Sequence, residues 1–411
     1  MKLKQFPLLI FIFFSLSASA QWTAKAVFPG TPRAKSTSFT VGDKIYVLGG
    51  VSSAGLIISD FWEYNITTNT WLQKPNFPGP ERYGGIAFVI NDTAYVGMGG
   101  NDFGYLDDLW QYIPATGMWF QRAGMPAGQP QHENQRVEPF AFAIDGKAYV
   151  GGGSGFVFGA NQTSNIAFYD LWEYNPATNW WTPMADIPDF TGRYMSIGVA
   201  MNGKGYVGLG CNVSQTVNHQ SFWEYDVVSN TWTAKANFPN NFSTDAGAFV
   251  LNSTLYLVGG VNLNPVSLSS QFYKYDPVAN MWVALSTFNG GAIAGEFAIS
   301  TGTRAFTGTG YNGSLNPRND LWELTTTAVN EISNNAQVIN IYPNPACDRI
   351  MIAAPGEISL IEIYDVAGNV VISKSDTHEP LSVAKLSTGM YSLKVTFKDG
   401  SPGYSRFIKS N

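Results

Sequence analysis

The chain has 411 residues and a formal net charge of −6, and only 13% of its residues are charged while 14% are aromatic. This length is enough for two or three domains with a large core. The low charge and the 42 glycines are typical of many short strands joined by tight turns, and no run of Lys or Arg indicates a nucleic-acid or anionic-membrane partner. We therefore expect an all-β protein that binds no nucleic acid.

Residues 1–20 have the parts of a secretory signal peptide. Two lysines precede a short apolar run over residues 7–16, and Ala18-Ser19-Ala20 fits a signal-peptidase site. A membrane anchor is the alternative, but the apolar run is too short to span a bilayer comfortably. We expect a secreted protein whose mature chain begins at Gln21.

A pattern of about 50 residues recurs six times between residues 21 and 326. Each copy has an aromatic anchor followed four positions later by glycine; the anchors are Tyr46, Tyr95, Tyr149, Tyr206, Tyr256 and Phe306, and the glycines are Gly50, Gly99, Gly153, Gly210, Gly260 and Gly310. A glycine fixed at one position predicts a positive φ or a close backbone approach. Each copy reads as four short strands, and the first is rich in Gly, Ala and Ser. Small residues fit an innermost strand, where sheets crowd around one axis.

The sixth copy lacks its last strand. Other copies run on to a second tryptophan, as in FWEYNITTNTW at 61–71, but no tryptophan follows Trp322. Trp22 stands 24 residues before Tyr46 and supplies the missing position from the N-terminus. A linear solenoid does not need this strand, whereas a closed ring uses it to pair both chain ends and to remove an exposed edge. We predict that residues 21–27 pair with roughly residues 320–326.

These copies resemble kelch repeats, with Gly–Gly after the second strand, Tyr in the third and Trp in the fourth. The resemblance covers about residues 21–326 and implies a six-bladed kelch β-propeller. Two positions depart from the pattern: Tyr273 replaces the Trp of the third strand, and Phe306 replaces the Tyr of the second.

The composition changes after residue 326. Residues 327–337 read as a polar linker, and residues 338–411 contain short alternating strands separated by turn signals. This tail resembles the C-terminal sorting domain of type IX secretion cargo; the matching residues are Tyr342, Pro343, Asn344, Pro345, Asp365, Gly368, Gly389 and Tyr391. The resemblance implies a small Ig-like β-sandwich that an outer-membrane type IX translocon recognises, with cargo attached to surface lipopolysaccharide after tail cleavage. An ordinary Ig-like binding module is the alternative.

No constellation predicts a metal or a cofactor, and we expect neither. The three histidines lie in separate regions, and none has a second His or Cys at ligand spacing. Cys211 and Cys347 fall in different expected domains, so we expect no disulfide. No GxSxG elbow, HExxH motif or P-loop is present. We expect a monomer.

Four arginines share one position, thirteen residues before the anchor: Arg33, Arg82, Arg136 and Arg193. Their recurrence favours a structural role, yet the position lies where the innermost strand begins, at the mouth of the channel. Guanidinium groups there would favour an anion or a sugar acid. Both hypotheses remain open from the sequence.

Residues that break the repeat pattern are the stronger ligand candidates. Glu138, Asp245 and Glu296 are unrepeated acids near the expected axis, and the third repeat carries two long insertions that build up one face of the mouth. We predict ligand contact from Arg82, Arg136, Glu138, Arg193, Asp245 and Glu296, with His132 and Phe156 at the rim.

Two classes of function fit these features. The first is a non-catalytic binding module for a glycan or protein ligand, because aromatic, Asn- and Gly-rich loops suit such contacts without chemistry. The second is a sugar-active enzyme of the sialic-acid mutarotase (N-acetylneuraminate epimerase) type. Arg136 and Glu138 would then bind the sugar carboxylate and move a proton. Only analogy between folds supports the second.

Overall fold

The structure is a computed structural model that divides the chain into two compact units at Thr326. It describes residues 20–126, 134–158, 163–188, 190, 192–326, 339–354, 356–365, 370–375, 380–398 and 402–410. Residues 1–19 of the expected signal peptide, the expected linker, His132 and Gly368 lie outside these residues. In the described ranges no helix is long and apolar enough to cross a membrane.

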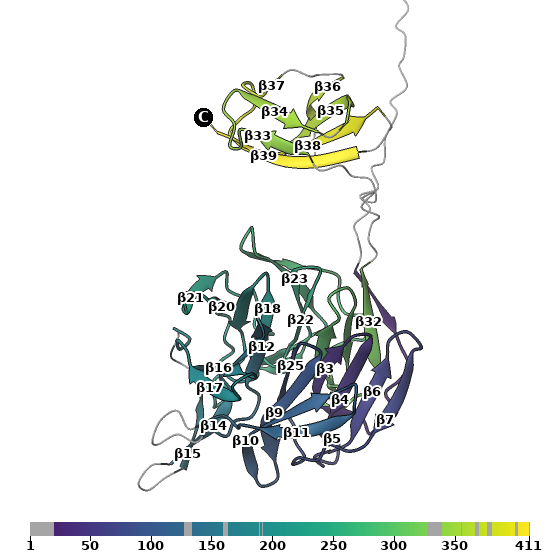
Figure 1. Cartoon of the computed structure of the whole chain (residues 1–411), viewed down its shortest axis with the longest axis vertical. Coiled ribbons are helices and arrows are strands. Elements are labelled where there is room, and N and C mark those ends of the chain that lie inside the picture. The colour runs from purple at the N-terminus through teal and green to yellow at the C-terminus, as the bar shows by residue number, and fades with distance from the viewer. Residues whose placement is uncertain are drawn as a thin grey trace, which may run out of the picture. The chain divides into compact units, whose positions relative to one another are not determined.

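The described part of the first unit contains six four-stranded antiparallel sheets (Figure 1). From the inner to the outer strand, the first three are β3 (Thr37–Val41), β4 (Lys44–Leu48), β6 (Phe61–Asn65) and β7 (Thr70–Lys74); β8 (Ile86–Ile90), β9 (Thr93–Asn101), β10 (Gly104–Ile113) and β11 (Met118–Arg122); and β12 (Phe140–Ile144), β13 (Lys147–Gly151), β16 (Leu171–Asn175) and β17 (Trp180–Pro183). The other three are β18 (Ile197–Met201), β19 (Lys204–Gly208), β20 (Phe222–Asp226) and β21 (Thr231–Lys235); β22 (Gly247–Leu251), β23 (Thr254–Val258), β26 (Phe272–Asp276) and β27 (Met281–Ala284); and β29 (Phe297–Ser300), β30 (Ala305–Gly308), β32 (Leu321–Thr326) and β1 (Ala20–Ala24). Four short two-stranded sheets complete the described part: β2 (Arg33–Ala34) with β5 (Val51–Ser52), β14 (Ser154–Phe158) with β15 (Thr163–Ala167), β24 (Val261–Leu263) with β25 (Val266–Leu268), and β28 (Ile293–Ala294) with β31 (Tyr311–Asn312).

The innermost strands form a closed circle. Each contacts the next in the order β3, β8, β12, β18, β22, β29 and back to β3. Small side chains such as Ser38, Ala87, Ala141 and Ala298 line the channel between them. This is the arrangement of a β-propeller, and it explains the Gly-, Ala- and Ser-rich first strand of each repeat.

The recurrent glycines link neighbouring sheets. Each donates its backbone N–H to a carbonyl oxygen at the arginine position of the next sheet: Gly50 to Arg82, Gly99 to Arg136, Gly153 to Arg193, Gly210 to Ser243, Gly260 to Ile293 and Gly310 to Arg33, at 2.8–2.9 Å. All six glycines have φ between 80° and 100°. A Cβ on Gly99 would lie 2.6 Å from the Tyr83 carbonyl oxygen. The predicted positive φ and close backbone approach are therefore both confirmed.

The N-terminal strand completes the sixth sheet. β1 pairs antiparallel with β32, with Ala20 opposite Thr326 and Trp22 opposite Leu324. The Trp22 side chain is 3% exposed and packs against three phenylalanines: Phe249, Phe272 and Phe288, with ring centroids 6.2, 5.4 and 5.0 Å away. Trp22 therefore takes the position that is empty after Trp322 in the sequence.

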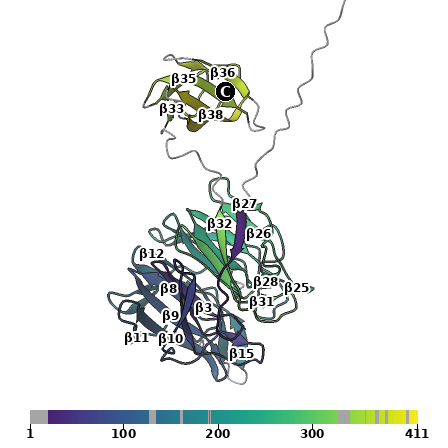
Figure 2. The same ribbon diagram turned by 90° about the vertical axis from the view of Figure 1, so that its right-hand side faces the viewer.

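The second unit consists of two small antiparallel sheets around one core (Figure 2). One contains β33 (Asn340–Tyr342), β34 (Arg349–Ala353) and β37 (Leu381–Ser382), and the other β36 (Val370–Lys374), β35 (Ile358–Tyr364), β38 (Gly389–Phe397) and β39 (Pro402–Lys409). Buried residues from both sheets, including Ile350, Ile361 and Leu393, form one hydrophobic cluster.

The residues of the expected sorting motif serve this small core and its turns. The Tyr391 ring is buried, lies 5.7 Å from the Phe407 ring, and its hydroxyl donates to the Ser387 carbonyl oxygen. Asn344 Oδ1 accepts a hydrogen bond from the Ile408 N–H at 2.9 Å. Pro343 and Pro345 lie in the turn after Tyr342, Asp365 follows β35, and Gly389 begins β38.

Replacement of Trp22 by alanine tests how far the ring depends on its closing strand. We expect Trp22→Ala to lower the free energy of unfolding by about 3–5 kcal/mol, because a buried indole is lost and a cavity remains. Trp180→Ala is the matched control, because the Trp180 side chain is 67% exposed. Denaturant unfolding of the two variants should separate them, and equal stability would show that closure of the ring does not depend on the Trp22 side chain.

Candidate functional site

One face of the propeller is built from the segments that precede the innermost strands and from the loops that follow the second strands. These segments pair in all six repeats: Ala34 with Val51, Tyr83 with Gly100, Val137 with Ser154, Tyr194 with Cys211, Thr244 with Val261 and Ala294 with Tyr311. The pair Val137–Ser154 joins the two insertions of the third repeat. In Figure 1 strands β14 and β15, which belong to this face, lie at the lower end of the first unit, and β32 lies toward its upper end.

Six backbone segments form a narrow ring at this mouth of the channel. The ring residues are Lys35, Gly84, Glu138, Met195, Asp245 and Gly295, and all have φ between 53° and 63°. Five backbone hydrogen bonds connect them: Lys35 to Gly295, Gly84 to Lys35, Glu138 to Gly84, Asp245 to Met195 and Gly295 to Asp245, written from N–H to carbonyl and 2.7–3.0 Å long. Four of the six are not glycine, although L-residues rarely adopt this conformation. Such strain persists only where surrounding structure enforces it, and it is concentrated at functional sites.

Three charged side chains of the ring meet across the channel. Lys35 Nζ forms an ion pair with Glu138 Oε1, and it lies 3.8 Å from Asp245 Oδ2. The neighbours of Lys35 in the ring are glycines, and a Cβ on Gly84 would lie 2.5 Å from Glu138 Cγ. Glycine at this position therefore leaves room for the Glu138 side chain. We call Lys35, Glu138 and Asp245 the charged trio.

Glu138 has an unused acceptor. Its side chain is 8% exposed, and among the described residues Oε2 has no hydrogen-bond partner. Burial raises the pKa of Glu138 to about 6, the Asp245 carboxylate adds to this effect, and Lys35 opposes it. Although burial disfavours the charge of Lys35, the two carboxylates raise its pKa overall. The trio thus combines one ammonium group with two carboxyl groups, and one buried carboxyl oxygen has no hydrogen-bond partner among the described residues.

Five aromatic residues lie on the segments next to the ring. They are Tyr83, Tyr105, Phe156, Tyr194 and Tyr311; the rings of Tyr105 and Phe156 stack with centroids 4.8 Å apart and an interplanar angle of 19°. Burial raises the pKa of all four tyrosines, and the Glu138 carboxylate raises each of them further. The backbone places these tyrosines beside the ring. Tyr83 and Tyr194 directly precede the ring residues Gly84 and Met195, Tyr311 pairs with the residue before Gly295, and Tyr105 pairs with Gly100, the partner of Tyr83. We call these five residues and the charged trio the mouth site.

A polar cavity of about 250 Å³ lies in the channel next to the ring. Three buried oxygens that line it have no hydrogen-bond partner among the described residues: Thr37 Oγ1, Ser196 Oγ and Glu296 Oε2. Glu296 Oε1 accepts a hydrogen bond from the Gly247 N–H at 2.9 Å, and burial raises the pKa of this carboxyl to about 8. A cavity with several unsatisfied polar atoms is suited to ordered water or to polar ligand groups.

The recurrent arginines are part of the scaffold. Arg33, Arg82 and Arg136 are at most 1% exposed. Each forms a two-point ion pair with an aspartate of its own sheet, Asp60, Asp108 and Asp170 respectively, and donates to a nearby backbone carbonyl. The same aspartates accept from the indole N–H of Trp62, Trp110 and Trp172. These three aspartates, which stand just before the third strands of their sheets, therefore neutralise the arginines.

Arg193 has a different acceptor. Ser221 takes the place of the aspartate, and the guanidinium group donates to the Ser221 side chain and to the Leu209 carbonyl oxygen. Its side chain is fully buried, and burial lowers its pKa to about 10. The expectation that Arg82, Arg136 and Arg193 contact a ligand is thus corrected, because their guanidinium groups are covered and engaged by the protein itself. We leave all three out of the mouth site.

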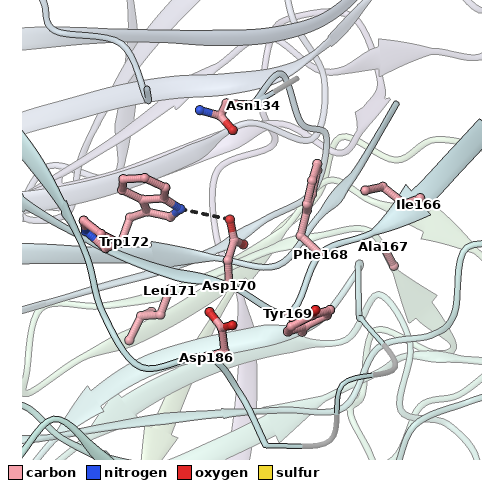
Figure 3. A pocket seen from close by; sticks show the side chains of 10 residues that line it. Asn134, Ile166, Ala167, Phe168, Tyr169, Asp170, Leu171, Trp172 and Asp186 are labelled. Atoms are coloured by element: carbon pink, nitrogen blue, oxygen red, sulfur yellow. Dashed lines mark hydrogen bonds between the residues drawn. The ribbon is translucent and has the colours of Figure 1, made fainter. Parts of the chain in front are cut away.

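A second cavity, of about 420 Å³, lies beside the third sheet (Figure 3). Phe168, Tyr169 and Trp172 contribute aromatic surface, and Asp170 and Asp186 contribute carboxylates. Asp170 is already engaged by Arg136 and by the Trp172 indole. Burial raises the pKa of Asp186, and Asp170 adds to the effect.

The structure brings together Glu138, Asp245 and Phe156 from the predicted set, and it places Glu296 in the adjacent cavity. Sequence reasoning did not select Lys35 or the four tyrosines. A signal was present for Lys35, because it stands at the same repeat position as Glu138 and Asp245. In the described ranges no group of three or more His, Cys, Asp or Glu side chains is arranged to hold a metal ion.

Truncation of Arg136 should damage the fold rather than a ligand contact. We expect Arg136→Ala to reduce the free energy of unfolding by about 3–5 kcal/mol, because Asp170 loses its buried partner. Lys204→Ala is the control: the ion pair of Lys204 with Asp226 is about one-third exposed on both sides, so its loss should change the free energy of unfolding little. Denaturant unfolding at pH 7 measures both. An Arg136→Ala protein as stable as Lys204→Ala would contradict the scaffold role.

Glu296 should make the propeller less stable as the pH rises. Its folded pKa is about 8, against an ordinary value of 4.5, so between these pH values the folded state holds a proton that the unfolded state lacks. Within that window this residue should cost about 1.4 kcal/mol of stability per pH unit. Glu296→Gln should remove the slope, as measured by unfolding at pH 5, 6, 7 and 8. Parallel curves for the two proteins would show that Glu296 titrates normally.

Comparison with known proteins agrees with both units. The model of the kelch motif matches residues 32–78, and the model described as the secretion system C-terminal sorting domain matches residues 340–409. The solved structure of YjhT superposes with a TM-score of 0.60 at 18% sequence identity, covering 74% of this chain and 98% of that one. At this identity the superposition shows the propeller fold alone.

Curated relatives match over short segments. Kelch-like protein 25 of Xenopus tropicalis is 26% identical over 161 residues, which are 39% of this chain and 26% of that protein. N-acetylneuraminate epimerase of Escherichia coli strain K12 is 43% identical over 56 residues, 13% of this chain and 15% of the enzyme. The matches thus span about a quarter or less of each relative. The chain is a kelch-repeat β-propeller protein with a C-terminal sorting domain that directs its export by type IX secretion to the cell surface or the extracellular space.

Proposed function

We propose that the propeller is a non-catalytic binding module that takes a glycan at the mouth site. The observation that carries this proposal is Glu138 Oε2, a buried carboxylate oxygen without a hydrogen-bond partner among the described residues. An ionised carboxylate only accepts hydrogen bonds, so the group that completes it must be a donor. Leaving such an acceptor unsatisfied is costly, and a sugar hydroxyl in place would recover part of that cost.

The aromatic surroundings suit a sugar. Tyr105 and Phe156 come from different sheets and stack on each other at the rim, so they form a joint apolar surface. Tyrosine combines such a surface with a hydroxyl that can donate or accept. A sugar ring presents apolar C–H faces and a polar edge, and the mouth site offers a partner for each.

The site is also held rigidly before a ligand arrives. Each ring residue has a backbone hydrogen bond to at least one neighbour in the ring, and Lys35 holds one oxygen of Glu138. A site that is already ordered loses little conformational entropy on binding. This arrangement favours recognition, and no nucleophile or metal is needed for it.

The 56-residue match to N-acetylneuraminate epimerase supports a second candidate, a sugar epimerase or mutarotase. Glu138, with a pKa near 6, has suitable properties for a proton-transfer group. Arg136 cannot bind a sugar carboxylate as that candidate requires, because its guanidinium group is enclosed by Asp170, Gly152 and Asn134. If polarimetry shows that the pure protein accelerates mutarotation of a free sugar, this result would favour the epimerase or mutarotase candidate.

Binding to a glycan array tests the first candidate. We expect the wild-type protein to give defined hits, and Glu138→Gln and Tyr105→Ala to weaken them by roughly 1.5–3 kcal/mol when a charged hydrogen bond or a stacking surface is lost. Isothermal calorimetry on the best hit measures the loss, and melting temperatures check that each variant is folded.

Trp180→Ala is the control, because this exposed residue stands beside the turn between the third and fourth strands, on the opposite face. It should bind normally. Loss of binding in Asp186→Asn but not in Glu138→Gln would instead move the ligand to the cavity beside the third sheet, and an array without hits would contradict the proposal.

A further inference from the structure

We infer that the mouth site selects its glycans by charge, preferring those with a free amino group to neutral ones and neutral ones to sugar acids. The inference rests on the glycan-binding function proposed above and names the ligand class of the same site. It reverses the preference for anions that the arginine positions suggest from the sequence.

The net charge of the site is the first argument. Lys35 contributes one positive charge, and Glu138 and Asp245 contribute two negative ones, so the charged trio has a net charge of −1. In the nearby repeats Arg33, Arg82 and Arg136 are each neutralised by their own aspartate. Arg193 is buried and donates to the Ser221 hydroxyl and to the Leu209 carbonyl oxygen. The four recurrent guanidinium groups are therefore enclosed by the protein itself and are not exposed to an acidic sugar.

The position of Lys35 is the second argument. Its ammonium group already lies between the two carboxylates, which shows that a primary amine fits their geometry. It engages Glu138 Oε1, and the buried Oε2 has no hydrogen-bond partner among the described residues. A ligand ammonium at Oε2 would donate a charge-assisted hydrogen bond, which is about twice as strong as a neutral one, and would bring the site to neutrality.

A ligand carboxylate meets the opposite conditions. Its oxygens cannot donate to Glu138 Oε2, and they would face the two carboxylates of the trio at close range. Like charges brought together in a partly buried site repel strongly because solvent screens them little. A neutral sugar lies between these cases, since its hydroxyl groups donate without adding charge.

The test uses a glycan array that carries chito-oligosaccharides in free-amine and N-acetylated form, neutral glucans, and uronic-acid oligosaccharides. The first two probes share one skeleton and differ in charge. We expect the free-amine probes to bind at least tenfold more tightly than their N-acetylated forms, and the uronic acids to stay at background. Raising the salt concentration from 50 to 500 mM should reduce the amine preference, because the selection is electrostatic.

Two variants separate charge from shape. Glu138→Gln keeps the size of the side chain and removes its charge, so it should reduce binding of free-amine probes at least tenfold while neutral probes lose less. Asp245→Asn should act in the same direction and serves if the first variant does not fold, as judged from its melting temperature. Equal losses for amine and neutral probes in both variants would overturn the charge selection.

The outcomes also separate this inference from the proposed function. Uronic acids that bind as well as neutral glucans would overturn the charge order while leaving a glycan-binding propeller intact. An array with no signal from any glycan would overturn the proposed function, and this inference with it.

Discussion

Closure of the ring is the constraint on which the rest of the structure depends. The hydrogen bond from the Gly310 N–H to the Arg33 carbonyl oxygen completes a circle that the five equivalent bonds begin. Each bond requires a glycine with positive φ, because a Cβ would collide with the neighbouring backbone. Since the bond at one repeat fixes the start of the next innermost strand, the circle sets where every mouth residue lies. The outer pairing of β1 with β32 reinforces the same closure.

A symmetrical scaffold here supports an asymmetrical site. The recurrent Arg–Asp pairs, with their indole donors, use the same geometry in successive sheets. They hold the segments that lead into the ring, and their charges cancel locally. The ring position, two residues after the arginine position, differs between repeats. It is Lys35 in one repeat, Glu138 and Asp245 in two others, and glycine in the two repeats on either side of Lys35. The repeats therefore differ most at ring positions that share one backbone conformation but carry different side chains.

The sequence predicted much of the fold and part of the site. Repeat spacing located the strands, the glycines with positive φ and the strand that carries Trp22, because these depend on local backbone geometry and on period. The same spacing found Glu138 and Asp245 as exceptions to the pattern. It misjudged Arg136, since the partner that covers it, Asp170, is 34 residues away in the chain. Periodicity shows that a residue recurs, but not whether its charged end meets solvent or another side chain.

By itself, the sequence determined the all-β repeat architecture and the presence of a sorting domain, because short-range patterns and motifs encode both. Only the tertiary structure decided the chemistry of the channel mouth. Lys35 is 103 residues from Glu138 and 210 from Asp245 in the chain, and ring closure alone brings their charges together. The paired arginines do not make the mouth basic, because they are buried with aspartate partners, and the charged trio decides its net charge instead. Burial and pairing are properties of contacts between distant repeats, which no local pattern in the sequence specifies.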